Sequence, residues 1–538
     1  RPDRGAARRS GAVRGDRRGA GGGVRDGGPG AMNVVFDPQH LRLIAPEMVL
    51  TLSAFLVLGL SAFGGAGRNL WAPLLSLLAC AVTLASVLSF IWHLGWEALR
   101  APDLTIGFNG MFIVDAFSIF FKVVFLLAAM LTILVSGRYL DLERANAGEY
   151  YALILFAVVG MMFLASAGDF ITIFVALETM SLSFYVLVGF LKANRKSNEA
   201  ALKYFLLGSF STGILLYGIS LVYGTTGTTI LGLIGMSRAR MAMASPEAPI
   251  FVLGVILVTV GLAFKIAAVP FHMWAPDAYE GAPTPVTAFL STGSTAAGFV
   301  VVARVFSMSF LQIGGRWAAL LAILAVASMT LGNIAAILQE NIKRMLAYSS
   351  IAHAGYVLLG VIAMGLPGTA ETREYGLKAV LLYLLIYTFV NIGAFALVIA
   401  LKHEQVAGDR VADFAGLARR APASAFAMLI FMLSLSGIPA TAGFIGKWFL
   451  FGAAVKAHYT WLAAVAVINS AISLYYYIRV VVNMYMKAPV DAERFAPSWG
   501  QRVAVAACIA FTLFFGLYPQ PIIAFAEKSV LVLAPWAS

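Results

Sequence analysis

Charged residues and cysteines are scarce in this sequence, and both shortages narrow what the protein can be. Lysine, arginine, aspartate and glutamate make up 12% of the 538 residues, against 60% hydrophobic residues. The two cysteines, Cys80 and Cys508, lie in apolar runs and are too few for an iron–sulfur cluster or a usual zinc site. The histidines show no paired haem-ligand spacing, and the sequence has no Rossmann or P-loop fingerprint. We therefore expect no redox cofactor in this chain and place any redox or ATP chemistry on another chain.

The abundant apolar residues indicate a polytopic membrane protein, since a mean hydropathy of +0.86 is rare among soluble proteins. A net charge of +12 could suggest nucleic acid, but the basic residues are spread over short loops and the first 31 residues. Residues 1–31 are rich in arginine and glycine and lack the apolar stretch of a signal peptide. We expect them to be a disordered or spuriously translated basic tail; the alternative is a tail that contacts lipid headgroups.

Apolar runs of about 20 residues mark the membrane spans. We predict fourteen, at residues 43–63, 70–92, 111–136, 150–167, 170–191, 200–223, 249–270, 284–306, 317–339, 344–365, 377–401, 423–453, 459–485 and 500–518. The loops after odd-numbered spans carry more lysine and arginine than the loops on the opposite side. The positive-inside rule then places the loops after odd-numbered spans in the cytoplasm and both termini on the outer side of the membrane.

Few charged residues fall inside these spans. The basic ones are Lys122, Lys203, Lys265, Lys447 and Arg479. A charged side chain at bilayer depth costs roughly 2.5 to 3.5 kcal/mol on insertion scales and tends to be kept for a function. Among carboxylates, only Glu178 lies near the middle of a span. A carboxylate near a lysine in such a place has two closely balanced protonation states, which suits a proton relay.

Two of these lysines lie beside breaks in their helices. Lys265 precedes Pro270 by five residues, and Lys447 follows Gly437, Pro439 and Gly443. Proline removes a backbone donor, and lipid tolerates the resulting break only where protein or a water-filled cavity satisfies the freed groups. A desolvated lysine can also accept and release protons where a solvated one cannot. The pattern therefore indicates an ion path at two broken helices, the seventh and the twelfth.

A short internal match supports a repeated architecture. SFYVLVG (183–189) and AGYVLLG (354–360) lie five spans apart, the same separation as the two broken helices. Spans 4–8 and 9–13 would then be two repeats, inverted because five is odd. We predict an all-α polytopic membrane protein with two inverted five-helix repeats. Its segments are a basic tail (1–31), a three-helix segment (32–140), a first repeat (141–310), a second repeat (311–490) and a C-terminal helix and tail (491–538).

Other charged residues leave their roles open. His353 lies about ten residues into its span, where an imidazole could shuttle protons or simply be hydrogen-bonded. Lys203 is close enough to its span end to extend its ammonium group to the interface. Lys122 and Asp115 are seven residues apart on one helix face, and structural pairing or extension to the interface is the favoured interpretation.

Several long stretches together carry a family resemblance. They are GDFITIFVALETMSLSFYVLVGF, NEAALKYFLLGSFSTGILLYGISLVYG, GLAFKIAAVPFHMWAPDAYEGAPTPVTAFLS, NIKRMLAYSSIAHAGYVLLG and LSLSGIPATAGFIGKWFLF. With these, the chain from Met32 onward resembles the antiporter-like membrane subunits of respiratory complex I, and among them the subunit N family of bacterial NADH-quinone oxidoreductases. The lysine at position 447 and the lack of a long lateral extension after the last span fit that family better than its M and L counterparts.

The resemblance implies a proton relay through specific residues. Glu178 matches the family's fifth-helix glutamate, Lys203 its sixth-helix lysine, and Lys265 and Lys447 the lysines of the broken helices, while His353 falls at a tenth-helix histidine. The chain departs from the family in the eighth helix, where FLSTGSTAAGF places Thr295 at the position of a common lysine. A threonine cannot carry the charge of a proton, so we expect water or the tenth-helix histidine to bridge this step.

The resemblance also implies an activity and partners. The chain would couple quinone reduction to proton transfer as one membrane subunit of an NADH:quinone oxidoreductase, in contact with lipid and with other antiporter-like and small membrane subunits. FMN, iron–sulfur clusters and quinone would belong to partner subunits. Two alternatives remain open at this point: a subunit of a multi-subunit Na+/H+ antiporter, and a quinone-binding redox subunit.

Overall fold

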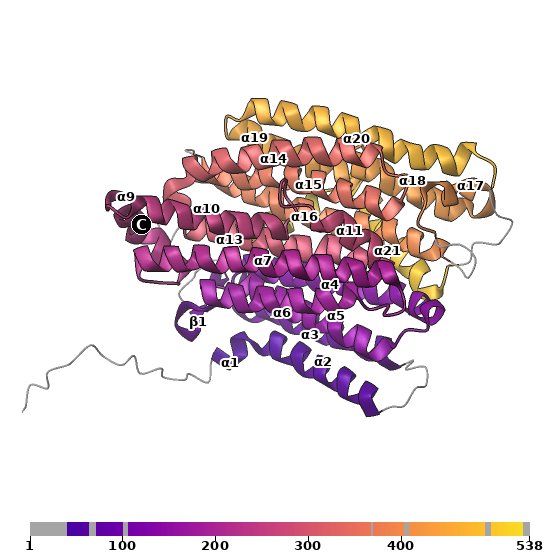
Figure 1. The fold of residues 1–538 in the computed structure, drawn as a ribbon, viewed down its shortest axis with the longest axis horizontal. Helices are drawn as coiled ribbons and strands as arrows, with labels where there is room; N and C mark the ends of the chain where they lie inside the picture. Colours follow the sequence, from indigo (N-terminus) through magenta and orange to yellow (C-terminus); the bar gives the residue numbers. More distant parts are fainter. Residues whose placement is uncertain are drawn as a thin grey trace, which may run out of the picture.

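The computed structural model describes residues 40–63, 71–99, 106–366, 369–402, 408–489 and 497–530, and these are almost entirely helical. The helices lie side by side in one bundle, with α2 (Ala45–Phe63) at one edge and α20 (Thr460–Met486) at the other (Figure 1). The predicted basic tail, residues 1–31, and the end of the chain from residue 531 lie outside the described residues.

Within the described residues, thirteen helical segments are long and apolar enough to cross a membrane. Besides α2 and α20 they are α3 (Trp71–Ala98), α4 (Ala116–Glu143), α5 (Ala147–Ser166), α6 (Phe170–Val188), α7 (Arg195–Thr226), α10 (Ala248–Lys265), the continuous segment of α12 (Thr284–Phe289), η4 (Leu290–Ser294) and α13 (Thr295–Met308), the segment of η5 (Leu311–Ile313) and α14 (Gly314–Ile337), α15 (Ile342–Gly365), α16 (Ala370–Leu401) and α21 (Trp499–Leu517). Two shorter helices, α18 (Pro422–Ser436) and α19 (Ala442–Lys456), together make the fourteenth crossing. The predicted number of spans is confirmed.

Short elements connect these helices. They are α1 (His40–Leu43), β1 (Ile106–Gly107), η2 (Phe108–Gly110), β2 (Phe112–Ile113), α8 (Leu231–Leu233), η3 (Ile234–Arg238), α9 (Ala239–Ala244), α11 (Trp274–Gly281), η6 (Val411–Phe414), α17 (Leu417–Arg420) and α22 (Gln520–Lys528). The two strands pair antiparallel. Helix α22 is the short terminal helix that follows the last span.

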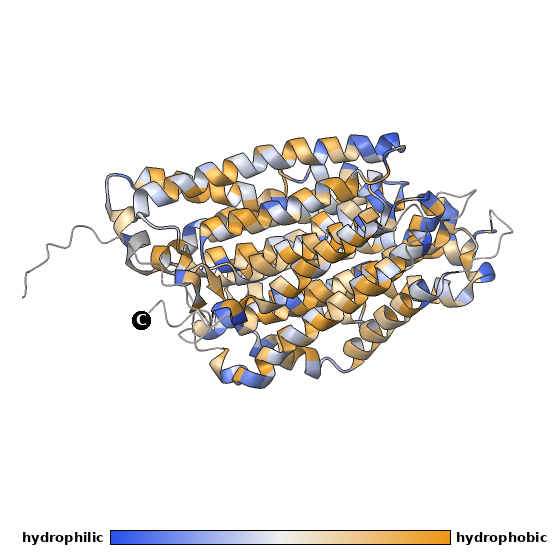
Figure 2. Ribbon diagram, turned by 90° about the horizontal axis from the view of Figure 1, so that it is seen from below, coloured by the Kyte–Doolittle hydropathy of each residue, from blue (hydrophilic) through white to orange (hydrophobic). Residues whose placement is uncertain are grey.

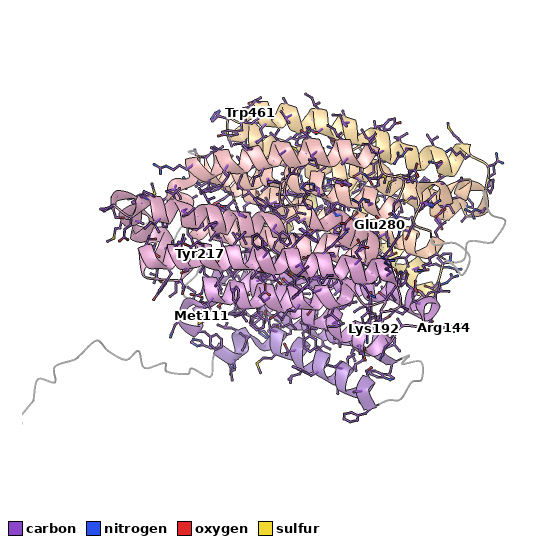
Figure 3. All side chains as sticks on the ribbon, in the orientation of Figure 1. Met111, Arg144, Lys192, Tyr217, Glu280 and Trp461 are labelled. Carbon is purple, nitrogen blue, oxygen red and sulfur yellow. The ribbon has the colours of Figure 1, made fainter. Side chains whose placement is uncertain are left out.

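The bundle has two polar ends and an apolar middle (Figure 2). We name the ends after the short helices that lie there in Figure 1, the α9 end and the α17 end. Arg144 and Lys192 lie toward the α17 end, whereas Met111 lies toward the α9 end (Figure 3). The apolar middle is the band that lipid would cover.

The most deeply buried helices lie at the centre of the bundle. The segment from α12 to α13 is buried throughout its hydrophobic window, and α15 and α16 are almost wholly buried, whereas α3 and α21 bury only about a quarter of theirs. Polar groups on the central helices are therefore shielded from lipid and must find partners inside the protein.

Two sets of five helices repeat in opposite directions. The first is α5, α6, α7, the broken pair α10–α11, and α12–α13; the second is α14, α15, α16, the broken pair α18–α19, and α20. In each set the third helix has 32 residues and the fourth is broken. The first set begins at the α17 end next to Arg144, and the second begins at the α9 end, where Gln312 accepts a hydrogen bond from Arg240 of α9. The predicted inverted repeats are therefore confirmed.

Local signals move some predicted boundaries. Helix α7 is longer than the predicted 200–223, because Asn194 caps its first turn and Gly227, with φ 71°, ends it. Helix α10 stops at Lys265, five residues before the predicted end at Pro270. The break therefore begins at the lysine itself.

Candidate functional site

Lys265 lies at the C-terminal end of α10, where the helix breaks. Its side chain is 3% exposed, and its Nζ donates a hydrogen bond of 2.6 Å to Ser181 Oγ on α6. Beyond it, Ala267 adopts a left-handed conformation with φ 53°, and the N–H of Val269 donates to Ser328 Oγ over 2.9 Å. The neighbouring helices thus satisfy the opened backbone, and the negative end of the helix dipole favours an ammonium group there.

Glu178 lies one turn before Ser181 on α6. The carboxylate is half-buried and accepts a hydrogen bond of 2.8 Å from Thr212 Oγ1 on α7. Its charge acts on Lys265, but no ion pair within 4 Å joins the two among the described residues. The serine hydroxyl takes that place. The structure therefore brings Glu178 and Lys265 into one site without direct contact.

Lys447 lies in the second break, 3% exposed on α19. Its Nζ donates to the carbonyl oxygen of Ser436, the last residue of α18, over 2.9 Å, and to Ser470 Oγ over 2.8 Å. Gly437 follows with φ 87°, and a Cβ atom there would lie 2.8 Å from the Lys447 side chain. Ala440 is also left-handed, with φ 69°. The Lys447 ammonium thus lies at the C-terminal end of the half-helix α18, although Lys447 itself belongs to the following half-helix, α19.

His353 lies between the two breaks on the buried helix α15, 4% exposed. Its Nδ1 is hydrogen-bonded to the hydroxyl group of Tyr383, and its Nε2 lies 3.0 Å from the hydroxyl of Tyr477. The charge of Lys447 acts on the imidazole. Both ring nitrogens are therefore hydrogen-bonded, as in an ordinary buried histidine. These contacts are also compatible with proton transfer.

Lys203 lies away from the buried lysines. Its side chain is 47% exposed and forms ion pairs with Glu199 over 2.8 Å and with Asp277 of α11 over 3.0 Å. Arg344 of α15 also pairs with Asp277, over 2.7 Å. Burial alone would raise the pKa of Asp277, but hydrogen bonds from Arg344 and Lys203 hold the pKa of this carboxyl below its usual value. Helix α11 is thereby tied to both repeats.

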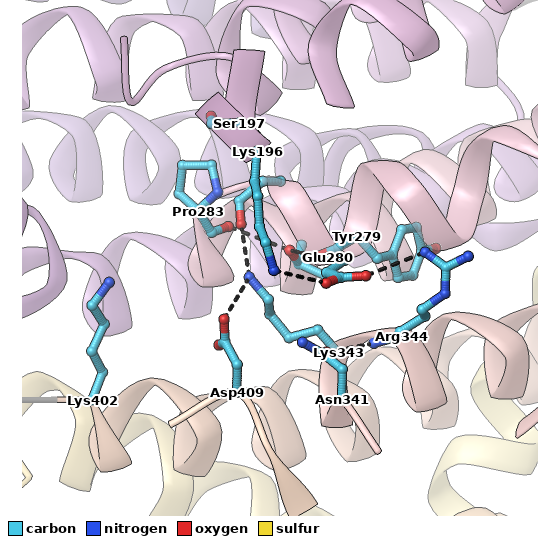
Figure 4. A network of polar contacts seen from close by, with 12 residues as sticks. Lys196, Ser197, Tyr279, Glu280, Pro283, Asn341, Lys343, Arg344, Lys402 and Asp409 are labelled. Atoms are coloured by element: carbon cyan, nitrogen blue, oxygen red, sulfur yellow. Dashed lines mark hydrogen bonds and ion pairs between the residues drawn. The ribbon is translucent and has the colours of Figure 1, made fainter. Parts of the chain in front are cut away.

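The same polar region continues at the α17 end (Figure 4). Glu280 pairs with Lys196 over 3.2 Å and with Arg344 over 3.2 Å. The buried Lys343 donates to the carbonyl oxygen of Ala282 over 3.1 Å. Of these groups, Lys196 and Glu280 border an open cavity of about 190 Å³ on the first repeat, together with Lys203 and Asp277. This network fixes the end of the broken helix α10–α11 against the second repeat.

The predicted pairing of Lys122 with Asp115 is wrong, because each has a different partner. Lys122 pairs with Glu47 of α2 over 2.7 Å, with exposed fractions of 1% and 0%. Asp115 caps α4 by accepting from the N–H of Ser118 over 2.7 Å, and it also binds Arg304 through two hydrogen bonds of 2.9 and 3.0 Å. Helix capping orients Asp115 away from the residue seven positions later.

Two of these buried charges were missed by the sequence reasoning. Glu47 and Arg304 lie near the ends of the predicted spans 43–63 and 284–306, where a charged side chain is ordinarily expected to reach the interface. Their one sequence signal is that each lies within its predicted span, four residues after the start at 43 for Glu47 and two before the end at 306 for Arg304. Arg479, in contrast, binds the free carbonyl oxygens of Ile337 and Gln339 at the end of α14. Within the described residues, no cluster of histidine, cysteine or carboxylate side chains could hold a metal ion.

Comparisons with known proteins agree with this architecture. A family model described as NADH:quinone oxidoreductase/Mrp antiporter, TM, matches residues 167–473. NADH-quinone oxidoreductase subunit N 2 of Solibacter usitatus is 47% identical over 434 residues, covering 80% of this chain and 86% of the relative.

Solved structures give the same result at the level of the fold. A chain of respiratory complex I from Thermus thermophilus with bound aureothin is 34% identical with a TM-score of 0.72, over 90% of this chain and 99% of that one. A chain of the Mrp complex from Dietzia sp. shares the fold at 22% identity and a TM-score of 0.79, over 92% and 98%. The fold is therefore common to both groups, and sequence identity separates them: this chain belongs to the NADH-quinone oxidoreductase subunit N family of antiporter-like membrane subunits.

Proposed function

We propose that this chain is a proton-translocating membrane subunit of a complex I-type NADH:quinone oxidoreductase. The observation that carries the proposal is the pair of buried ammonium groups, Lys265 and Lys447, each at the broken end of a half-helix. FMN, iron–sulfur clusters and quinone belong to partner subunits in this scheme, together with the energy that quinone reduction supplies. Other antiporter-like and small membrane subunits would flank the chain in the bilayer.

In this scheme the first lysine is switched by a change of partner. When Glu178 and Lys265 approach to about 4 Å, their attraction at an effective dielectric constant near 20 is on the order of 4 kcal/mol. An attraction of this size corresponds to about three pK units, which is enough to hold the proton on the lysine. When the pair opens, the lysine keeps only the neutral Ser181 hydroxyl, and its proton can leave toward Lys447. The scheme calls the arrangement without an ion pair between the described Glu178 and Lys265 the open one.

Lys203 has an indirect role in this proposal. Its partners are Glu199 and Asp277, not Glu178, so it can tune the first break only through α11. We assign the α17 end, where Lys203 lies, to the cytoplasm of a bacterial inner membrane. That assignment rests on the excess of basic loop residues and leaves the α9 end in the periplasm.

A matched pair of lysine variants tests the proposal. Lys265→Ala should abolish most of the NADH-driven acidification that the assembled complex produces in sealed vesicles, because it removes the buried proton carrier. Lys192→Ala removes an ammonium that is exposed in the loop after α6 and should pump normally. A Lys265→Ala complex that assembles in normal amount and keeps the wild-type ratio of protons to electrons would overturn the proposal.

The second candidate is a subunit of a multi-subunit Na+/H+ antiporter, which the shared fold favours. The two functions differ in their driving force. Vesicles that contain the chain with its partners should acidify on addition of NADH without any imposed sodium gradient. If a sodium gradient alone drives proton movement and NADH does not, the antiporter function is the correct one.

A further inference from the structure

Two arginines, Arg240 and Arg373, border an open cavity at the α9 end of the bundle. Its volume is about 370 Å³, and its lining comes from α9 in the first repeat and from η5, α14, α15 and α16 in the second. Small-molecule sites usually have volumes of roughly 300 to 1,000 Å³. The cavity lies at the opposite end of the bundle from the ion-pair network of Figure 4, and the proposed function does not use it.

The polar groups that border this cavity are positively charged or neutral. The Nε of Arg240 donates a hydrogen bond of 2.9 Å to Gln312 Oε1. No hydrogen bond or ion pair joins the Arg373 side chain to the residues that the structure describes, and its Nε is buried without a partner. Among the described residues that line the cavity, none is a carboxylate. Since buried donors normally have partners, the two arginines favour an anion in the space between them.

The backbone at the cavity has the same polarity as the arginines. Helix α14 is 24 residues long and begins at Gly314, and both Gly314 and Gly315 line the cavity. No side chain caps this helix start, and a Cβ atom at Gly315 would meet no atom within 4 Å. The positive end of the α14 dipole therefore adds to the attraction that the two arginines exert on an anion.

An exposed apolar face of α14 continues from the cavity. Ala319 and Ile323 follow Gly315 at intervals of four residues, and all three are exposed. Ile334 and Leu338 continue the exposed face toward the other end of the helix. Lipid covers such a face in a membrane. A ligand with both a negative charge and acyl chains would therefore contact the protein along its whole length.

We propose that Arg240 and Arg373 bind the phosphate group of an anionic phospholipid in this cavity, and that its acyl chains lie along the exposed face of α14. A guanidinium group matches a phosphate group in shape as well as in charge. A zwitterionic headgroup carries its own cation, so it would neutralise the two arginines less well. The proposal does not depend on the path that protons take.

The bound lipid would join the two repeats at the α9 end. At the α17 end, ion pairs of Arg344 with Asp277 and Glu280 already join them. At the α9 end, an arginine from each repeat borders the same cavity, and the described lining offers no carboxylate to either. The phosphate group would supply the negative charge that connects α9 to α16.

The first test changes the charge at one open position. The assembled complex is placed in phosphatidylcholine vesicles that contain a little phosphatidylglycerol with a photoreactive group beside its phosphate, and labelled peptides are identified by mass spectrometry. Gly315→Glu adds a carboxylate at the cavity and should reduce labelling around Gln312 and Arg373 severalfold. Gly315→Gln has the same size without the charge and should keep most of the label. Both side chains can be accommodated, because a Cβ atom at Gly315 meets no neighbour.

Arginine variants test the same site by removing its own charges. Arg240→Gln and Arg373→Gln should each reduce the labelling severalfold, and Arg373→Lys should retain more label than Arg373→Gln. Arg42→Gln is the control, because Arg42 is exposed on α1 and does not border the cavity; its complex should be labelled like the wild type. Labelling is expressed per assembled complex, so that a loss of assembly is not counted as a loss of binding.

Competition identifies the ligand. Unlabelled phosphatidylglycerol should displace the label from the cavity, whereas additional phosphatidylcholine or glycerol phosphate should not. Equal displacement by glycerol phosphate would mean that the cavity binds a soluble anion, and the proposal would be wrong. It would also be wrong if the wild-type complex is not labelled there, as when an acidic segment of a partner subunit fills the cavity. Equal loss of label in Gly315→Gln and Gly315→Glu would contradict it as well.

Discussion

The two broken helices hold their lysines in the same kind of place by opposite means. In the first, Lys265 is the last residue of the half-helix α10. In the second, Lys447 belongs to the following half-helix, α19, and reaches back to the carbonyl group of Ser436 at the end of α18. Both ammonium groups therefore lie at a C-terminal helix end, where the dipole is negative. The two repeats thus place the ammonium at the same kind of helix end. They differ in which half-helix carries the lysine: the first half, α10, in one and the second half, α19, in the other.

The partners of the two lysines differ more than their positions. Glu178 acts on Lys265, whereas both hydrogen-bond partners of Lys447 are neutral oxygens. When SFYVLVG and AGYVLLG are superimposed, Ser349 takes the position of Glu178. The first break can thus be switched by a carboxylate, and the second has a hydroxyl at the equivalent position. In the proposed function, control would therefore lie in the first repeat, and the second repeat would receive the proton.

The largest expected effect is at Lys447 itself. Lys447→Ala should abolish most NADH-driven pumping by the assembled complex, and Lys447→Arg should be nearly as damaging because a guanidinium does not readily release a proton. Both are measured as protons per electron in sealed vesicles, with Lys456→Arg at the exposed end of α19 as the control. Normal pumping by Lys447→Arg would mean that this lysine provides only a fixed charge.

Gly437→Ala should damage the second break alone. A left-handed conformation costs a non-glycine residue roughly 1 to 2 kcal/mol, and the new Cβ would also displace the Lys447 side chain. We expect a lower unfolding temperature of the complex and a severalfold loss of pumping. Gly59→Ala is the control, because its Cβ would meet no atom within 4 Å. Equal behaviour of the two variants would show that Gly437 is not needed to seat the lysine.

The two serine hydroxyls should differ in importance. Ser181→Ala removes the one hydrogen bond that Lys265 makes in the described part of the chain, and a hydrogen bond to a charged group is worth about 1.5 to 3 kcal/mol. Ser470→Ala leaves Lys447 with the Ser436 carbonyl, so its effect should be smaller. The pumping rates of the two variants compare the breaks directly. A larger loss at Ser470 would reverse the assignment of control to the first repeat.

The smallest effect concerns Asp277, which ties α11 to both repeats. Because its pKa is lowered in the folded protein, its ionised form stabilises the structure above its unfolded pKa of about 3.9, and this stability is lost as the pH falls through the folded value. In Asp277→Asn, the stability of the folded protein should therefore depend less on pH below about pH 4. This is measured as a shallower fall of the unfolding temperature as the pH is lowered. If the unfolding temperature of the variant falls with pH as steeply as that of the wild type, the attachment of α11 does not depend on this carboxylate.

The sequence predicted most of the fold because lipid imposes a simple rule. Apolar runs and the two breaks marked the fourteen crossings, the inverted repeats and the lysines at 265 and 447. What it could not predict were the partners. Ser181 stands between Glu178 and Lys265, and Glu47 pairs with Lys122, because such contacts depend on how distant helices pack. The hydroxyl groups around His353 carry no charge, so a search for charged residues inside spans passes over them.

The most direct test of the central claim, that one proton path joins the two breaks, is the proton-to-electron ratio of Lys265→Ala, Lys447→Ala and the double variant. The three complexes are measured in the same vesicles, with assembly checked for each. The account predicts that each single variant loses the same share of pumped protons and that the double variant loses no more. Losses that add in the double variant would contradict it, since two lysines on separate paths would behave in that way.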